Sequence, residues 1–156
     1  MCKTRNPFRI ARELGIHVEY RDDFKALKGM YAVVMRNRFI AINSSLEDWV
    51  KTTVCAHELV HDRLHQHLAK KVAMREFTLY DMRRRPEYEA NIFAADILIS
   101  DDDILELIDN EYDVPMIAGT LEADINLVLI KLDSLRLQGY DVRAPYRADS
   151  DFLGKS

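Results

Sequence analysis

The sequence has little cysteine, no long apolar run and no excess of positive charge. Its two cysteines, Cys2 and Cys55, are too few for a disulfide framework and are typical of a reducing compartment. The longest uninterrupted apolar run covers residues 30–35, far short of the roughly 20 residues that a membrane span needs. The N-terminus has no apolar stretch of the signal-peptide kind. We therefore expect a cytoplasmic protein that does not enter a membrane.

The charge balance argues against direct binding of nucleic acid. Twenty-two Lys and Arg residues stand against 26 Asp and Glu residues, which gives a formal net charge of −4. The chain as a whole therefore has no positive field to attract phosphate groups. Hydrophobic residues make up 48% of the 156 residues, which is enough for the core of one globular domain.

The first part of the chain has the patterns of a short helix and three strands. Asn6, followed by proline, is a typical N-cap for an amphipathic helix over residues 7–14. Alternation of apolar and polar residues predicts a strand over 16–20. Residues 29–35 and 38–43 are rich in Val, Ile, Phe and Tyr and flank a turn-prone pair, which predicts a β-hairpin.

Helical patterns dominate the rest of the chain. Ser44 and Glu47 match a capping box, and an unbroken apolar stripe then predicts a helix over 46–67. Pro86 begins a second helix with apolar residues at helical spacing. Residues 121–137 are again helical in period.

Together these patterns predict an α+β fold with a small antiparallel sheet, two central helices and a helical C-terminal segment. Residues 69–85 are less regular than their neighbours. We expect one domain over residues 1–139, with its core in 1–100 and the helical segment in 101–139. Residues 140–156 have the composition of an irregular tail.

The string His57-Glu58-Leu59-Val60-His61 lies in the middle of the longest helix expected before residue 100. Side chains four residues apart share one face of a helix, so both imidazoles can bind one metal ion. Glu58 lies about 100° round the helix, where it can reach a water held by the metal and act as its base. A chance occurrence of this string need not lie on a helix, so its position favours a zinc hydrolase site.

The neighbouring thiol and imidazoles are less suited to this site. His65 lies about 12 Å along the helix axis from His57, at 1.5 Å per residue, too far to share an ion. We expect His65 and His67 to be surface groups or groups outside the metal ligands. Cys55 faces the other side of the helix, as a small core residue does.

A catalytic zinc ion needs a third protein ligand and one open position. The helix that begins at Pro86 offers three carboxylates, from Glu87, Glu89 and Asp96. Spacing favours Glu89 over Glu87 only weakly, because an acid in the first turn is also favoured by the helix dipole. From the residues alone the third ligand stays open.

Two segments resemble the signatures of the ImmA/IrrE family of metallopeptidases. Residues 56–65, Ala-His-Glu-Leu-Val-His-Asp-Arg-Leu-His, are similar to the first signature. Residues 89–98, Glu-Ala-Asn-Ile-Phe-Ala-Ala-Asp-Ile-Leu, are similar to the second, and the resemblance covers most of 10–137. The chain has Val60 where the family usually has Gly, and Ser100 where Pro usually follows.

The resemblance implies a zincin-like fold with zinc ligands at His57, His61 and Glu89 and with Glu58 as the catalytic base. It implies a cytosolic protein of bacterial or phage origin. It also implies a protein substrate, since several family members cleave a helix-turn-helix repressor and so activate a mobile element or a stress response. We expect the hairpin strand nearest the site to hold an extended substrate by edge pairing.

Two other functions are compatible with parts of the sequence, namely DNA binding and regulation without catalysis. Ile117-Ala118, followed by Leu121 and Val128, loosely resembles a helix-turn-helix pattern, which would bind DNA. Residues 121–135, however, offer one base, Lys131, against three acids, so we expect a packing element. The other rival is a non-catalytic regulatory protein with a structural metal site. The presence of Glu58 argues against it, because a purely structural site has no use for a base.

Two further features bear on substrate recognition. Residues 101–113 contain seven acids and no base, whereas 63–85 contain seven bases and two acids. Either stretch is a candidate for docking a partner of opposite charge, although a solvated surface is the commoner explanation.

Tyr80, Tyr88 and His65 are candidates for stabilising the transition-state oxyanion.

Overall fold

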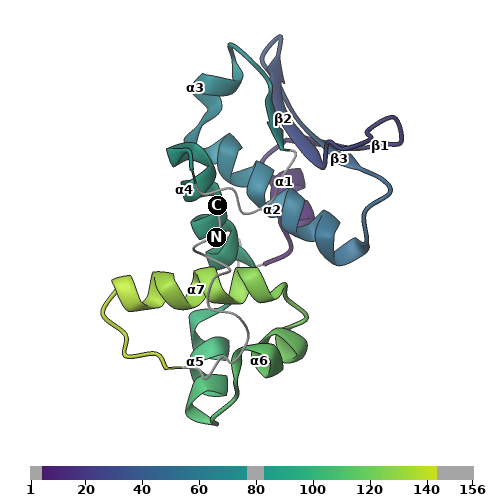
Figure 1. Ribbon diagram of the computed structural model, residues 1–156. Coiled ribbons are helices and arrows are strands. Elements are labelled where there is room, and N and C mark those ends of the chain that lie inside the picture. Colours follow the sequence, from purple (N-terminus) through teal and green to yellow (C-terminus); the bar gives the residue numbers. More distant parts are fainter. Residues whose placement is uncertain (1–4, 77–82, 144–156) are drawn as a thin grey trace.

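The computed structural model describes residues 5–76 and 83–143 and arranges them in two lobes (Figure 1). The elements in chain order are α1 (Pro7–Glu13), β1 (His17–Arg21), β2 (Gly29–Val34), β3 (Asn37–Asn43), α2 (Asp48–Leu64), α3 (Gln66–Ala69), β4 (Met74–Glu76), α4 (Arg85–Leu98), α5 (Asp101–Asp109), α6 (Val114–Leu121) and α7 (Ile125–Leu137). The sheet, α1 and α2 lie in one lobe and α5, α6 and α7 in the other, with α4 between them. The expected α+β class is confirmed. Among the described residues, no helix combines the length and apolar character needed to cross a membrane.

The sheet contains the predicted hairpin but is mixed rather than antiparallel. Its strand order is β1-β3-β2-β4. Strands β2 and β3 are antiparallel, and Met35 and Arg36 between them have the positive φ angles of a type I′ turn, 49° and 68°. Strand β1 instead pairs in parallel with β3. The reason is the connection over residues 22–28, which carries the chain from β1 past β3 to β2.

A fourth strand lies in the stretch that had no regular pattern. Strand β4 pairs antiparallel with β2, with Met74 opposite Tyr31 and Glu76 opposite Gly29. The edge of β2 that we expected to receive a substrate is therefore covered by β4 over residues 29–31.

Helix α2 packs across the sheet and forms the core of the first lobe. Tyr31, Ile40 and Ile42 of the sheet are buried against Val54 and Leu59 of the helix. Each such buried side chain contributes roughly 1.5–3 kcal/mol relative to an exposed one. The position of the histidines on α2 is thus fixed by apolar packing.

A buried carboxylate adds polar bonds between α2 and two strands. Tyr31 Oη donates to Asp62 Oδ1 at 2.6 Å, and Arg38 Nη1 lies 2.9 Å from Asp62 Oδ2. Hydrogen bonds to a charged group contribute about 1.5–3 kcal/mol. Asp62 follows His61 directly, so these bonds hold the end of α2 that carries the site.

The predicted bounds of the helix over residues 46–67 were wrong by two to three residues at each end. Helix α2 begins at Asp48, and its N-cap Glu47 makes no capping bond with its side chain. The capping box does not form because the backbone N–H of Ser44 extends the sheet by donating to Arg21 O at 2.9 Å. The helix ends at Leu64 because His65, with φ −125° and ψ 20°, leaves the helical conformation. By contrast, the side chain of Asn6 caps α1 as predicted.

The second lobe is a helical cluster, as expected for the C-terminal segment. Apolar side chains of α5, α6 and α7 meet in its core with Ala95 of α4. Lys131 of α7 is buried and pairs with Asp96 and Asp101, so its ammonium group does not face solvent. Residues 140–143 belong to no helix or strand, and residues 144–156 of the predicted tail lie outside the described residues.

Candidate metal centre

Helix α2 brings His57 and His61 together on one buried face. Their Nε2 atoms lie 3.2 Å apart, and each residue is 1% exposed. This arrangement follows from the spacing of four residues, which places both side chains on the same side of the helix. Cys55 is buried within the apolar core, as expected, and burial raises the pKa of its thiol to about 12.

Helix α4 supplies a carboxylate to both histidines, and it comes from Glu87. Its Oε2 lies 2.9 Å from His57 Nε2, and its Oε1 lies 3.4 Å from His61 Nε2. Burial alone would raise the pKa of Glu87. The hydrogen bonds with the two histidines outweigh burial and hold that pKa well below its ordinary value. Glu87 is therefore a carboxylate ready to bind a cation.

Glu89 lies on a different side of α4 and does not join this group. Its Oε2 lies 3.3 Å from His65 Nε2, and its Oε1 accepts from Arg85 Nε at 2.9 Å. Two helical residues correspond to a rotation of about 200°, so Glu87 and Glu89 point in different directions. The third candidate, Asp96, binds Lys131.

Glu76 of β4 completes a group of four that sequence reasoning missed. Its Oε2 lies 2.8 Å from His57 Nε2. Ligand atoms of His57, His61, Glu76 and Glu87 all lie within 4.8 Å of one another. Burial lowers the pKa of His57, but hydrogen bonds with Glu76 and Glu87 outweigh it and raise that pKa to about 10. Burial, the largest cause, raises the pKa of Glu76 to about 7.

This donor set fits a zinc ion. Two imidazoles with one or two carboxylates are common zinc ligands, with bonds of about 2.0–2.2 Å. Tetrahedral bonds of that length separate neighbouring ligand atoms by about 3.3–3.6 Å. The Nε2 atoms of His57 and His61 lie 3.2 Å apart. One oxygen of Glu87, Oε2, lies 2.9 Å from His57 Nε2, and the other, Oε1, lies 3.4 Å from His61 Nε2, so all three separations are near this spacing. These residues therefore form a buried group that could hold a metal ion.

The outer nitrogens of both histidines have partners that orient the rings. Asn91 Oδ1 accepts from His57 Nδ1 at 3.1 Å, which turns His57 Nε2 towards the carboxylates of Glu76 and Glu87. His61 Nδ1 lies 3.0 Å from the Nδ1 of His65, which is buried rather than at the surface. Asn91 was not predicted. Its spacing of four residues from Glu87 was the available signal, since it puts both on one face of α4.

Glu58 is buried beside this group without a hydrogen-bond partner. Its residue is 0% exposed, and neither carboxylate oxygen has a partner among the described residues. Burial, the largest cause, raises its pKa well above the ordinary value. The backbone of Gly29 passes so close that a Cβ there would lie 3.1 Å from Glu58 Oε1. A carboxylate that readily takes a proton therefore lies next to the candidate ligands.

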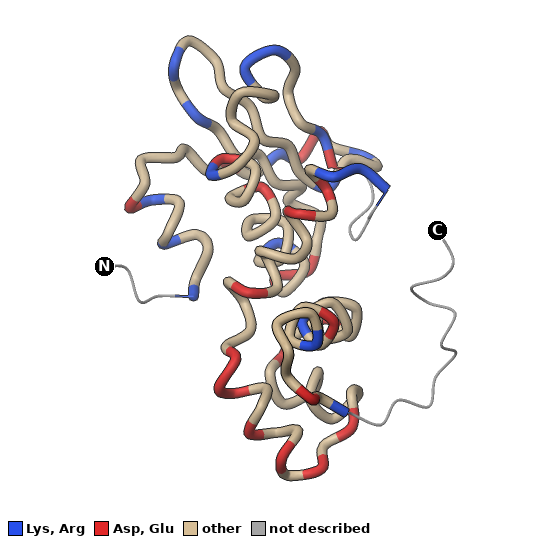
Figure 2. Tube along the Cα trace, turned by 90° about the vertical axis from the view of Figure 1, so that its left-hand side faces the viewer, with Lys and Arg blue, Asp and Glu red and all other residues tan. Residues whose placement is uncertain are grey.

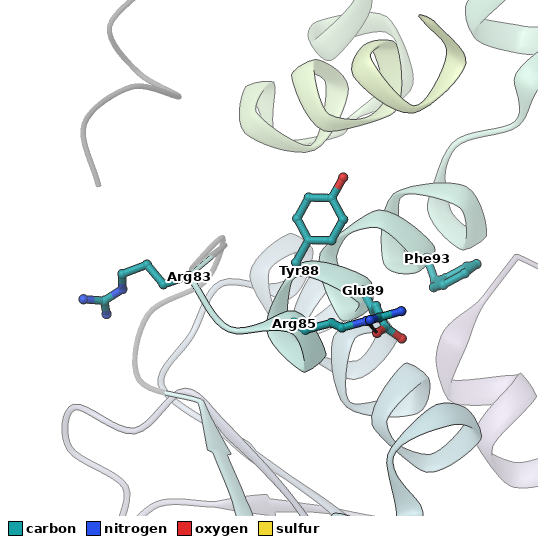
Figure 3. A pocket seen from close by; sticks show the side chains of 5 residues that line it. All are labelled: Arg83, Arg85, Tyr88, Glu89 and Phe93. Atoms are coloured by element: carbon teal, nitrogen blue, oxygen red, sulfur yellow. Dashed lines mark hydrogen bonds and ion pairs between the residues drawn. The ribbon is translucent and has the colours of Figure 1, made fainter. Parts of the chain in front are cut away.

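A hollow of about 670 Å³ lies on the outer side of α4 (Figure 3). It is lined by Arg83, Arg85, Tyr88, Glu89 and Phe93. Tyr88 lies here with 40% of its surface exposed, and no described contact joins it to the histidine pair. Tyr80, the other tyrosine considered for the oxyanion, lies outside the described residues.

Comparison with known proteins identifies a family and a phage relative. Residues 11–118 match the model of the peptidase M78 family, described as an IrrE N-terminal-like domain. The chain is 38% identical over 99 residues to a protein of Bacillus phage phi105 called "uncharacterized immunity region protein 2". That match covers 64% of this chain and 61% of the phage protein, so the chain spans less than two thirds of the relative's length.

Proposed function

The chain belongs to the M78 metallopeptidase family, and on this premise we propose that it is a zinc-dependent endopeptidase of the ImmA/IrrE type. The observation that carries the proposal is the convergence of His57, His61 and Glu87 beside Glu58. Three protein ligands next to an acid–base group are typical of a catalytic zinc site.

The proposed site divides the work among residues of two helices. His57, His61 and Glu87 would hold the metal, and Asn91 would keep His57 in the correct ring orientation. A bound zinc ion supplies Lewis-acid chemistry, which polarises a peptide carbonyl and lowers the pKa of water.

Glu58 would move the proton. Its carboxylate accepts a proton from the attacking water and later donates it to the leaving amine. Burial raises the pKa of Glu58, which makes its carboxylate a stronger base than an exposed one and suits this task. Full burial of Glu58 next to Gly29, at the start of β2, keeps bulk water from competing for that proton.

The proposed substrate is a helix-turn-helix repressor, whose cleavage would activate a mobile element or a stress response. Family resemblance is the main support, and the similarity to a phage immunity region protein agrees with it. Narrow specificity would come from docking the whole partner at surfaces outside the site. Figure 2 shows acidic residues along α5 and its surroundings, while Lys and Arg gather in the lobe that contains the sheet.

The test is to incubate the zinc-loaded protein with the repressor encoded beside it and, separately, with unfolded casein. We expect a single cut in the repressor, abolished by a chelator and by Glu58→Gln. Because docking is partly electrostatic, the cut should slow as salt rises. Rapid digestion of casein with the repressor left intact would contradict the proposal.

A second candidate is a non-catalytic regulator with a structural metal site. Glu76 favours it, because a fourth protein ligand is typical of closed structural sites. The two functions differ in their dependence on Glu58. A regulator that acts by binding keeps its effect in Glu58→Gln, whereas a peptidase loses it.

A further inference from the structure

Glu76 reaches the metal centre from the edge of the sheet rather than from a helix. Strand β4 has three residues, of which Arg75 is exposed and Glu76 is buried. The Glu76 carboxylate lies 2.8 Å from His57 Nε2, the nitrogen that Glu87 approaches at 2.9 Å. Glu76 therefore lies where it can bind the same ion as the helical ligands.

A fourth protein ligand and a buried base imply different states of the site. Four protein ligands leave a metal no open position, which is how structural sites are built. Glu58, however, is fully buried without a partner among the described residues, and a structural site does not need that costly arrangement. The fourth ligand and the buried base are both accounted for if the Glu76 carboxylate can leave the metal.

Strand β4 is suited to such a movement. It pairs with β2 over three residue pairs, Glu76 O accepts one further backbone hydrogen bond from Lys28 N–H at 2.8 Å, and the strand lies at the edge of the sheet. Short edge strands belong to the least stable parts of a fold. Opposite Glu76 in the register is Gly29, whose backbone lies against Glu58. Release of β4 would therefore uncover the base and the edge of β2 in one step.

We propose that Glu76 is the fourth protein ligand of the resting metal centre and that an extended substrate segment displaces it by taking the place of β4 on β2. The inference rests on the proposed function, since it concerns regulation of the same site. Edge pairing is a common way to bind an extended peptide. The resting protein would thus be inhibited by its own β4, which limits cleavage of proteins that cannot pair with β2.

The test uses cobalt-loaded protein and acetohydroxamate, a small chelating ligand that needs an open position on the metal. Binding is followed through the visible spectrum of the cobalt ion, with no substrate present. If the site is open in a tenth of molecules or fewer, Glu76→Ala should bind acetohydroxamate at least about tenfold more tightly than wild type. Glu76→Gln keeps the size of the side chain, and it should also bind acetohydroxamate more tightly than wild type.

Arg75→Ala is the matched control, because it alters an exposed residue of the same strand. It should bind acetohydroxamate as wild type does. Equal affinities for wild type, Glu76→Ala and Glu76→Gln would overturn the inference while leaving the metal centre intact. Failure of wild type to take up cobalt would instead overturn the proposed function, and the inference with it.

Discussion

Glu87 and Glu89 lie two positions apart on α4 and have different neighbours. Glu87 contacts both site histidines, whereas Glu89 contacts His65 and Arg85. Glu87→Ala should therefore lower zinc affinity by more than about 100-fold, and Glu89→Ala by about tenfold, as expected for an outer group. Competition with a zinc-binding dye measures both. A larger loss of zinc affinity in Glu89→Ala than in Glu87→Ala would contradict this and would make Glu89 the third ligand, as the family resemblance implies.

Asn91 acts on the metal only through His57. Without its side-chain oxygen, the His57 ring loses the partner that fixes its orientation. Asn91→Ala should lower zinc affinity by about 10–100-fold. Asn91→Asp should keep most of the affinity, because a carboxylate accepts the same hydrogen bond. Calorimetric titration with zinc compares them, and unchanged affinity in Asn91→Ala would contradict this role.

The pKa of Glu58 makes the stability of the metal-free protein depend on pH. Its native pKa is raised by burial above the ordinary 4.5, so the unfolded chain releases this proton at a lower pH than the native protein. Stability from this group is present below about pH 4.5 and falls as the pH rises towards the native pKa. Glu58→Gln should remove this loss, up to about 1.4 kcal/mol per pH unit. Urea unfolding of chelator-treated protein at several pH values measures the difference, and parallel pH profiles for the two proteins would be the contrary result.

At the level of residues, the sequence predicts relative positions only for side chains that are neighbours on one helix. His57, His61 and Glu58 belong to one turn of one helix, so their spacing alone predicts how they lie. The choice between Glu87 and Glu89 depends on how α4 is rotated about its axis against α2, which packing decides.

At the scale of elements, Gly29 lets β2 approach α2 closely. A Cβ at this position would overlap Val54 Cγ1 and approach Glu58 Oε1. Gly29→Ala should destabilise the protein by about 1–3 kcal/mol, the usual cost of overfilling a packed core.

Gly119→Ala in α6 is the control for this substitution. A Cβ there meets no atom within 4 Å among the described residues, and alanine favours a helix over glycine by about 0.5–1 kcal/mol. We therefore expect a small gain in stability, measured by urea unfolding beside Gly29→Ala. Equal effects of the two substitutions would show that close packing at Gly29 does not matter.

The elements themselves were predictable to differing degrees. The β2–β3 hairpin and the cap of α1 at Asn6 depend on neighbouring residues, and both are confirmed. The parallel pairing of β1 and the existence of β4 depend on partners distant in the chain. Three residues such as Met74–Glu76 carry too short a pattern to predict a strand, so Glu76 could not be predicted as a neighbour of His57.

At the scale of the whole molecule, α4 links the site to the second lobe. Its N-terminal half carries Glu87 and Asn91, and Ala95 nearer its end packs in the helical cluster. Lys131 of α7 binds Asp96 on the same helix. Packing in the second lobe thus helps to set the position of α4, and so of Glu87, against α2.

We propose above all that α2 and α4 together hold one catalytic zinc ion. Its most direct test is the zinc content of purified protein after dialysis, measured by plasma mass spectrometry. We expect about one zinc per chain in wild type and in Glu58→Gln, which keeps every proposed ligand, and almost none in His61→Ala. A wild-type protein without zinc, or a His61→Ala protein that retains a full equivalent, would contradict the claim.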